Sequence, residues 1–417
     1  MQIVIFEDER VQRLQPLVHF KPAYLLSAGC RTLLQKFRFH LGPDAGFSCH
    51  LRRYLEPVFR DRLPVFRFDG SRDKDLLLVN GRLLCDENAA SVILHNPPAP
   101  GQCLVQGGEV IFARVNAGSI VNLDAVLPDV IDTGALAAGS ETVGAEGFRL
   151  LCNIWDPVAF HPGELKRDAE TLELGKVLGE VSPRAILENR ENIYIGEGAK
   201  VKAGAVLDAE SGFVYISSGA VVEPQAVLAE NVFLCGSAVV KTGANLHCNV
   251  AIGSFSKTGG EIEDSIVEPY ANKQHDGFLG HSYISSWCNL GAGSATSDLR
   301  NNYGKVKIVQ DGREVQTDEQ FLGLLMGEHT KCSINSMFNT GTVAGTSANI
   351  FGGGFPPKNI PSFSWGGPER GFQHYDIEKA IETARAVMAR RNVEMSGAYE
   401  TMFRYVAALE QGGEMSV

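Results

Sequence analysis

The chain lacks the long apolar runs and the basic excess that mark several large classes of protein. None of its hydrophobic runs approaches the roughly 18 residues of a transmembrane helix, so we expect no membrane span. The opening residues, MQIVIFEDER, turn acidic too soon for a secretory signal peptide. The formal net charge of −11 argues against a general nucleic-acid binder and against binding to an anionic membrane surface.

The cysteines lack the spacing of a paired framework. Nine cysteines are dispersed singly between Cys30 and Cys332, and no Cys-x-x-Cys pair occurs. An odd, scattered set of this kind is typical of reduced thiols in a cytoplasmic protein. With 417 residues the chain is too long for one ordinary core, so we expect two or three domains.

A six-residue repeat dominates the middle of the chain. Branched aliphatic residues recur every six positions from Ile195 to Ile252, with a single step of nine between Leu207 and Ile216. Small residues follow most of them by four positions: Ala199, Ala205, Ala220, Ala226, Ala238 and Ala244. A helix repeats at about 3.6 and a strand at 2, and sandwich strands would show that period-two alternation. A period of six indicates triangular turns of three short parallel strands, the hexapeptide parallel β-helix.

The repeat continues beyond residue 252. Ile266, Phe278, Ile284 and Leu290 extend the register, and a second set comprises Met326, Cys332, Phe338, Ala344 and Ile350. Between them, Asp311-Gly312 lies within alternating residues and predicts a projecting β-hairpin. After the solenoid, Asp376 is the expected N-cap of an amphipathic helix, and a second helix is expected at residues 399–409.

The N-terminal part reads as an open α/β sheet. Strands are expected at residues 2–6, 75–79 and 108–115, with helices over residues 31–37 and from Asp86. A helical segment opens at Trp155 and is broken by Ser182-Pro183. We therefore expect an α/β domain at 1–182, a β-helix domain at 183–366 and a helical tail at 367–417.

The densest polar cluster covers residues 272–304. Equivalent residues of adjacent coils stack about 4.8 Å apart, so His275, Asn289 and the loop at residues 291–293 can converge. Histidine is the natural base near neutral pH, and glycine-rich backbone exposes N–H groups that can stabilise an oxyanion. Asn302 and Tyr303 offer neutral donors for a sugar or phosphate. The alternative is a polar ladder on a solvated face.

Three segments of this cluster resemble the acetyltransferase domain of GlmU, the bifunctional enzyme that makes UDP-N-acetylglucosamine. They are HDGFLG from His275, NLGAGS from Asn289 and NYG from Asn302. The longer stretches NKQHDGFLGHSY and SDLRNNYG are more similar to bacterial GlmU-like sugar nucleotidyltransferases, and this likeness extends over nearly the whole chain. The resemblance implies a left-handed β-helix, a homotrimer and acetyl-CoA as cosubstrate.

The resemblance also implies a role for each matching residue. His275 is the expected base that deprotonates the amine of glucosamine 1-phosphate, and Asn289 is the expected contact to the amine or acetyl group. The backbone around Ala292, with Gly293 and Ser294, is the expected site of the acetyl carbonyl of the cofactor. Asn302 and Tyr303 are the expected sugar-phosphate contacts.

Two positions depart from that pattern. Phe278 stands where GlmU has a tyrosine, and Glu263 stands near the place of a substrate-binding lysine. Lys257 or Lys273 is the expected substitute for that phosphate-binding charge.

The N-terminal part resembles sugar-1-phosphate nucleotidyltransferases. Arg13-Leu14, Pro16-Leu17 and Lys21-Pro22 follow the first strand, as in the family's motif. Arg13 and Lys21 are thereby implied to face nucleotide and sugar phosphates.

Two parts of that motif are missing. Residues 7–12 are acidic and contain no glycine, whereas a phosphate cradle needs close approach of the backbone. Arg82 follows Gly81 where the family has a magnesium-binding aspartate, and a cation cannot bind Mg²⁺. Asp86 or Asp156 could replace that aspartate, so Mg²⁺ stays a candidate cofactor. Equally, the fold could be retained for structure or for sugar-nucleotide binding alone.

We therefore expect a cytoplasmic enzyme that acetylates glucosamine 1-phosphate with acetyl-CoA and couples this to UDP-sugar formation in its N-terminal domain. Its expected partners are a sugar phosphate, a nucleotide and two further copies of itself. One alternative is an acyltransferase with a degenerate N-terminal domain, and another is a non-catalytic trimeric scaffold. A third is a hexapeptide carbonic anhydrase that binds zinc through His247, His275 and His281, which requires all three nitrogens within about 2.1 Å of one point.

Overall fold

The computed structural model describes residues 1–122, 126–310 and 312–412. It contains two compact units. The first unit consists of Met1–Leu26, Arg31–Ile154 and the C-terminal segment from Ser396, and the second consists of Ser27–Cys30 and Trp155–Met395. The boundaries of these units differ from those of the domains expected from the sequence, which were 1–182, 183–366 and 367–417. The reason is that helix α5 (Asp156–Ala169) belongs to the second unit and helix α7 (Gly397–Glu410) to the first.

The first unit is built on one mixed six-stranded sheet with the order β4-β1-β5-β7-β6-β8. Strand β1 runs parallel to both β4 and β5, and β7 runs antiparallel to its two neighbours β5 and β6. The central strands are apolar and almost fully buried, as strands covered on both faces must be. The strand bounds are β1 Gln2–Phe6, β4 Phe47–Cys49, β5 Asp75–Asn80, β6 Gln102–Gln106, β7 Glu109–Asn116 and β8 Glu141–Gly144.

Short helices connect these strands. Helix α1 (Leu33–Leu41) begins with a capping box between Thr32 and Gln35, and helix α3 (Glu87–Leu94) is capped by Asp86. Helices α2 (Glu56–Phe59) and α4 (Thr133–Ala138) complete the connections. The α/β class expected from the sequence is confirmed.

Helix α7 packs on the first unit through aromatic side chains. The ring of Phe20 lies 5.9 Å from Tyr399 and 5.1 Å from Phe403, and Tyr54 stacks on Tyr405 at 4.6 Å. The last helix is therefore part of the core of this unit.

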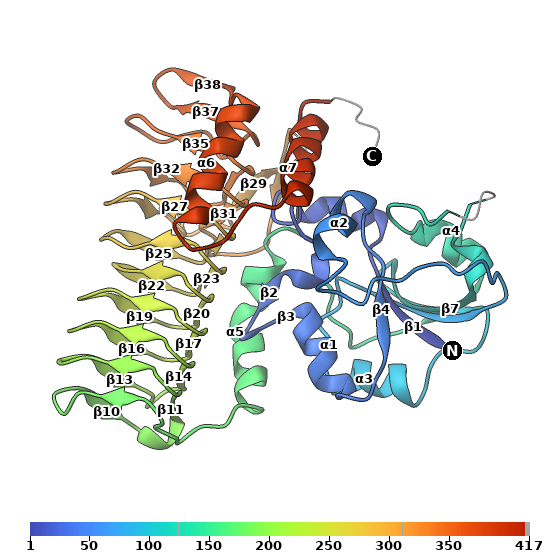
Figure 1. Ribbon diagram of the computed structural model, residues 1–417, viewed down its shortest axis with the longest axis horizontal. Coiled ribbons are helices and arrows are strands. Elements are labelled where there is room, and N and C mark those ends of the chain that lie inside the picture. Colours follow the sequence, from blue (N-terminus) through green and yellow to red (C-terminus); the bar gives the residue numbers. More distant parts are fainter. Residues whose placement is uncertain (123–125, 311, 413–417) are drawn as a thin grey trace. The chain divides into compact units, whose positions relative to one another are not determined.

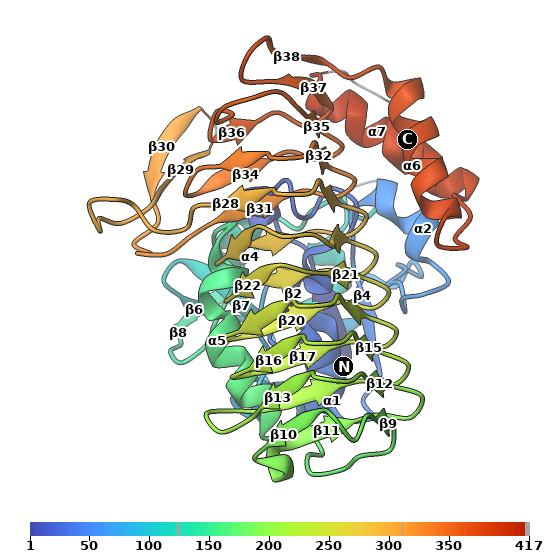
Figure 2. The same cartoon turned by 90° about the vertical axis from the view of Figure 1, so that its left-hand side faces the viewer.

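The second unit is a parallel β-helix whose coils stack along one axis (Figures 1 and 2). The coils contribute short strands to three faces, which differ in their number of strands. The six-stranded face comprises β10 Ile186–Glu188, β13 Val206–Asp208, β16 Val227–Ala229, β19 Asn245–His247, β22 Glu261–Glu263 and β25 Phe278–Gly280. The nine-stranded face comprises β11 Ile193–Ile195, β14 Val214–Ile216, β17 Val232–Leu234, β20 Val250–Ile252, β23 Ile266–Val267, β26 Tyr283–Ile284, β31 Leu324–Met326, β34 Thr342–Ala344 and β36 Asn359–Ile360.

The third face has eleven strands and carries most of the residues discussed below. It comprises β9 Glu180–Val181, β12 Lys200–Val201, β15 Val221–Val222, β18 Val239–Val240, β21 Lys257–Thr258, β24 Asn272–Lys273, β27 Asn289–Leu290, β32 Lys331–Cys332, β35 Asn349–Ile350, β37 Ser364–Gly367 and β38 Gly371–His374. The remaining short strands are β2 Ser27–Ala28, β3 Arg31–Thr32, β28 Ala295–Thr296 and β33 Met337–Phe338.

The six-residue repeat fills the interior of the coil, as predicted from the sequence. The series from Ile195 to Ile252 and the set from Met326 to Ile350 are buried in one core cluster. Between them the prediction is wrong by one position, because Val267 and Leu279 point inward instead of Ile266 and Phe278. Between residues 252 and 284 the step from one inward position to the next is once four residues and twice five, so a strict period of six loses the register.

Further elements lie outside the coil. Strands β29 (Lys307–Gln310) and β30 (Arg313–Gln316) form the expected hairpin, although Asp311 of its turn lies outside the described residues. Helix α6 (Ile377–Ala389) begins at Asp376, whose carboxylate accepts from the N–H groups of Glu378 and Lys379. Among the described residues, no helix is long and apolar enough to cross a bilayer.

Candidate functional sites

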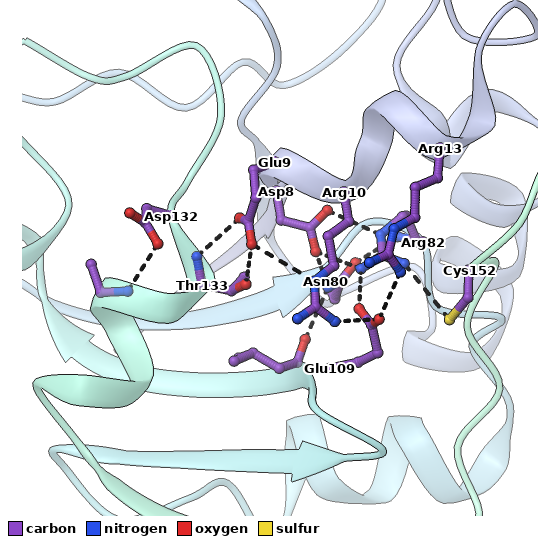
Figure 3. A network of polar contacts seen from close by, with 12 residues as sticks. Asp8, Glu9, Arg10, Arg13, Asn80, Arg82, Glu109, Asp132, Thr133 and Cys152 are labelled. Atoms are coloured by element: carbon purple, nitrogen blue, oxygen red, sulfur yellow. Dashed lines mark hydrogen bonds and ion pairs between the residues drawn. The ribbon is translucent and has the colours of Figure 1, made fainter. Parts of the chain in front are cut away.

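The sheet of the first unit has its switch point at β1. The chain leaves β1 toward β4 on one side, whereas β5 pairs with β1 on the other. In open α/β sheets, ligands bind outside the carboxyl ends of the strands at such a point. Asp8 follows β1, and Arg82 follows β5, so both lie at this edge (Figure 3).

A buried ion network occupies this edge. Arg82, with a side chain only 1 % exposed, forms a fork with Asp8: Nε donates to Oδ1 at 3.0 Å and Nη2 to Oδ2 at 2.6 Å. Nη2 also donates to Glu109 Oε2 at 2.6 Å, and Nη1 donates to the carbonyl of Leu151 at 2.9 Å. Asn80 donates to Asp8 Oδ2 at 2.9 Å.

The charges of this network stabilise one another. Burial alone would lower the pKa of Arg82, but Asp8 and then Glu109 outweigh burial and raise it above its ordinary value. Burial likewise opposes the charge of Glu109, yet Arg82 and then Arg10 keep the pKa of this carboxyl low. Arg82 and Glu109 are therefore both charged at neutral pH.

Arg13 lies at the exposed rim of the same network. Its Nη1 donates to Glu109 Oε1 at 3.4 Å, and half of its side chain is exposed. Arg10 pairs with the same carboxylate oxygen. Arg13 is thus placed where a phosphate could reach it, as its expected role requires.

Lys21 belongs to a neighbouring group organised by Arg52. Arg52 Nη2 donates to the Lys21 carbonyl at 2.7 Å, and its Nε donates to Glu7 Oε2 at 3.2 Å. Lys21 itself is only 6 % exposed. It is enclosed by the fold to a greater degree than Arg13.

The acidic segment that replaces the glycine-rich loop is a 3₁₀-helix, Glu9–Leu14, with its preceding residues. Each of its acids has a specific partner. Glu7 accepts from Arg52, Asp8 accepts from Arg82, and Glu9 accepts from both the N–H and the hydroxyl of Thr133 at 3.0 and 2.7 Å (Figure 3). These acids therefore anchor the segment, and the backbone does not form a phosphate cradle here.

This edge does not fit Mg²⁺ in the observed arrangement. Both oxygens of Asp8 and both of Glu109 accept from guanidinium groups. Asp86, one of the two proposed replacements, caps α3 and pairs with Arg149 at 3.0 Å. Hard divalent cations need free carboxylate oxygens, which Arg82 and its neighbours withhold.

In the β-helix, the turn that holds His275 lies directly on the glycine-containing loop of the next coil. The Gly293 N–H donates to the carbonyl of Asp276 at 3.1 Å. A Cβ on Gly277 would come within 2.0 Å of the Ser294 carbonyl oxygen, so only glycine permits this approach. Asn289 lies in register with Asn272 on the same face. The turn of His275 and the loop are thus brought together, whereas a shared site that includes Asn289 stays a prediction.

The backbone of that loop leaves one donor available. The N–H groups of Gly291, Gly293 and Ser294 are bonded to carbonyls at 3.1, 3.1 and 3.2 Å. Within the described ranges, the Ala292 N–H has no backbone acceptor. The Ser294 hydroxyl faces the interior and donates to the Ser333 carbonyl at 3.1 Å, so it is not directed toward a cofactor.

His275 itself is exposed, and its imidazole makes no hydrogen bond within the described part of the chain. Such an imidazole is accessible to an incoming amine. Asn302 and Tyr303 lie in the loop before the hairpin, where the side chain of Asn302 accepts from the Gly304 N–H at 3.1 Å. Tyr303 is 71 % exposed. No hydrogen bond between described residues links this loop to His275.

Lys273 is not at the surface, contrary to its expected contact with phosphate. It occupies an inward position of the coil in register with Thr258, and it is 1 % exposed. Its Nζ donates to the carbonyls of Gly259 at 2.8 Å and His275 at 2.5 Å. Burial lowers its pKa to about 8 despite the nearby Asp276. The signal was available in the sequence, because Lys273 lies six residues after the inward-facing Val267.

The three histidines of the zinc alternative are not brought together. Among the described residues, the compact group of ligand-type side chains is Glu263, His281 and Asp298, whose ligand atoms lie within 4.8 Å of one another. His281 Nδ1 is 2.8 Å from Asp298 Oδ2. Burial lowers the pKa of His281, but Asp298 and Asp264 outweigh burial and raise it. This group contains neither His247 nor His275, so the three-histidine site is wrong.

Comparison with known proteins identifies the class of the N-terminal part. Residues 3–177 match the sequence model of a family described as sugar nucleotidyl transferase. This part of the chain is thus a sugar nucleotidyl transferase domain, and it precedes a hexapeptide β-helix.

The chain is also a distant homologue of bifunctional enzymes. It is 23 % identical over 291 residues to a bifunctional sugar-1-phosphate nucleotidylyltransferase/acetyltransferase of Sulfurisphaera tokodaii, which covers 67 % of this chain and 65 % of that protein. It is 26 % identical over 182 residues to the bifunctional protein GlmU of Bartonella quintana, covering 44 % and 33 %. The matched segments thus span less than two thirds of these relatives.

One solved structure similar to part of this chain is the UDP-N-acetylglucosamine acyltransferase of Francisella novicida. It is 15 % identical and covers 52 % of this chain and 73 % of its own, with a TM-score of 0.27. A TM-score this low supports no conclusion about the fold. The β-helix is therefore assigned from the strand pairing of this chain alone.

Proposed function

We propose that the second unit transfers an acetyl group from acetyl-CoA to the amine of an amino-sugar 1-phosphate, with glucosamine 1-phosphate as the acceptor. The observation that carries the proposal is the stacking of the His275 turn on the Ala292 loop, and Asn289 lies on the strand that leads into this loop. A base and a backbone donor therefore lie at one corner of two consecutive coils.

The chemistry assigns a role to each group. A protonated amine is not a nucleophile, so His275 accepts its proton as the nitrogen attacks the thioester carbon. The Ala292 N–H stabilises the oxyanion of the tetrahedral intermediate. Collapse of the intermediate forms the amide and breaks the carbon–sulfur bond, and the proton held by His275 passes to the CoA thiolate.

Four further residues support this mechanism. Asn289 orients the amine or acetyl group, whereas Asn302 and Tyr303 contact the sugar phosphate. Lys273 acts as a positioning residue, because its ammonium holds the carbonyl of His275 from inside the coil.

For the first unit we propose binding of nucleotide and sugar phosphate through Arg13 and Lys21, with weak or absent magnesium-dependent nucleotidyl transfer. The supporting observation is that Arg82 and its partners occupy the edge where a metal-binding carboxylate would be needed. An acyltransferase with a degenerate N-terminal domain is therefore the second candidate.

The deciding experiment is thiol release from acetyl-CoA with glucosamine 1-phosphate, followed by mass spectrometry of the product. We expect one acetyl group on the sugar amine per thiol released. Absence of release with every amino-sugar phosphate tested would contradict the acetyltransferase proposal.

A further inference from the structure

A group of cations without carboxylate partners lies on the eleven-stranded face of the β-helix, beside the proposed acyl-transfer site. It comprises Lys241, Lys257, Arg390 and Arg391. The chain carries eleven more acidic than basic residues, so a cluster without a carboxylate is unexpected. Across the described ranges, none of these four side chains forms an ion pair.

Contacts bring three of the cations together, and Arg390 directly precedes one of them, Arg391, in the sequence. Arg391, just beyond helix α6, donates through Nη2 to the side chain of Asn272 at 2.6 Å. Asn272 is the strand partner of Lys257 on the preceding coil, and neighbouring strands lie about 4.8 Å apart. The Lys241 N–H donates to the carbonyl of Thr258 at 2.7 Å, which places Lys241 beside the same strand.

The cations repel one another, and this repulsion contributes to lowering the pKa values of Lys257 and Arg391. Burial lowers the pKa of Lys257, and Arg391, Lys241 and Arg390 lower it further. Burial and then Arg390 lower the pKa of Arg391. The C-terminus of a helix favours nearby cations, which explains the positions of Arg390 and Arg391 at the end of α6. It does not explain why Lys241 and Lys257 lie on the adjacent coils of the β-helix.

The cluster adjoins the proposed acyl-transfer site. Asn272 is in register with both Lys257 and Asn289, so the cations and Asn289 lie on consecutive strands of one face. We propose that Lys241, Lys257, Arg390 and Arg391 bind the phosphate groups of a ligand of the acyl-transfer site, either the nucleotide end of acyl-CoA or the phosphate of the acceptor sugar. This inference rests on the acyl-transfer function proposed above.

An aromatic side chain next to the cluster favours the nucleotide. Phe255 lies two residues before Lys257, and it is 45 % exposed. Its ring is the end of a stack in which Tyr270 follows at 5.1 Å and Trp287 at a further 4.2 Å. At the equivalent corner of the preceding coil the residue is Ser237, which has no aromatic ring. The face of the Phe255 ring on that side is therefore not covered by a further ring of the stack and can receive a base. Stacking of a base on an aromatic ring stabilises a bound nucleotide whatever the base is.

The test is calorimetric titration of the full chain with CoA, with CoA lacking its 3′-phosphate, and with glucosamine 1-phosphate. Lys257→Gln and Arg391→Gln should each weaken binding of the recognised ligand by about tenfold or more, because each removes a charge-assisted hydrogen bond. Lys200→Gln is the matched control: Lys200 lies in the same outward column of this face, three coils away. It should bind all ligands as the unaltered protein does.

Each outcome has a defined meaning. Loss confined to CoA assigns the cluster to the cofactor, and loss confined to glucosamine 1-phosphate assigns it to the acceptor. Unchanged affinity for both ligands in both variants, or no binding of either ligand by the unaltered protein, would overturn the inference. Phosphate-dependent binding without thiol release would support the site while contradicting the acetyl-transfer proposal. Circular dichroism confirms that the variants fold.

Discussion

At the scale of single residues, His275 is the group on which the proposed transfer depends most directly. Its exposed imidazole lies on the turn that packs against the Ala292 loop, so its removal leaves the coil intact while deleting the base. We expect His275→Ala to lower turnover by about 10²–10⁴ and to leave the unfolding temperature unchanged. Thiol release measures this effect, with the exposed and remote His95→Ala as control. Equal rates for His275→Ala and the unaltered protein would exclude His275 from the mechanism.

Tyr303 should show a different kinetic effect. Because its expected contact is to the sugar phosphate and not to the reacting atoms, Tyr303→Phe should raise KM for the sugar more than it lowers kcat. Steady-state kinetics at saturating acetyl-CoA separate the two parameters. A loss confined to kcat would place the hydroxyl at the reaction centre.

Lys273 gives the β-helix a pH-dependent stability. Its folded-state pKa, about 8, is depressed below the ordinary value of 10.5, so the charged form is disfavoured in the folded state. Between those values the unfolded chain binds more protons, and the free energy of unfolding therefore rises with pH. The difference corresponds to roughly 3 kcal/mol. Lys331, also lowered to about 8 by burial, contributes in the same direction.

Lys273→Met should remove about half of that dependence and leave the part due to Lys331. Urea unfolding at pH values from 7.5 to 10 measures it. A slope identical to that of the unaltered protein would show that Lys273 does not titrate in this range.

At the scale of secondary structure elements, the carboxyl ends of β1 and β5 determine what the first unit can do. Arg82→Met would leave Asp8 and Glu109 buried without their shared partner, and breaking a buried pair typically costs about 3–5 kcal/mol. Thermal unfolding measures this loss, and the exposed pair of Arg67 with Glu56 provides a control. Arg67→Met should change stability by less than about 1 kcal/mol. Comparable losses in both variants would contradict the stabilising role of the network.

The same edge leads to an expectation about activity. With UTP and a sugar 1-phosphate, pyrophosphate release should be slow and should respond little to Mg²⁺, because both oxygens of Asp8 and both of Glu109 accept from guanidinium groups. Rapid magnesium-dependent release would show that the network rearranges when substrate binds.

The elements also show how far sequence reasoning reaches. The period of six predicts the coil from Ile195 onward because every turn repeats the same local requirement for one inward aliphatic residue. It fails at Ile266 and Phe278, where one coil shortens by three residues and the next by one, and only strand pairing sets the register. Arg82 was recognised as incompatible with a metal, but its partner Glu109 lies on another strand, and no local pattern joins the two. Helix α7 was predicted as a helix, whereas its packing on Phe20 and Tyr54 depends on contacts distant in sequence.

At the scale of the whole molecule, the expected assembly is a homotrimer. A triangular coil has flat faces, and three copies placed side by side can cover apolar outward residues in closed symmetry. Val221 and Val239 form such a pair on adjacent strands of the eleven-stranded face, partly exposed and without charge. Light scattering at micromolar concentration should give three times the chain mass of 45.1 kDa.

Val239→Glu tests whether this face forms the contact. A charge at that position is solvated in a monomer but would be buried in a trimer that uses this face, so the variant should dissociate while keeping its fold. Thiol release should fall with dissociation if a partner subunit completes the site between Asn289 and the cation cluster. If the Val239→Glu protein is still a trimer, the subunits must contact one another through another face. If the unaltered protein is a monomer, the proposed trimer is wrong. Full activity in a monomeric variant would show that one chain holds the complete acyl-transfer site.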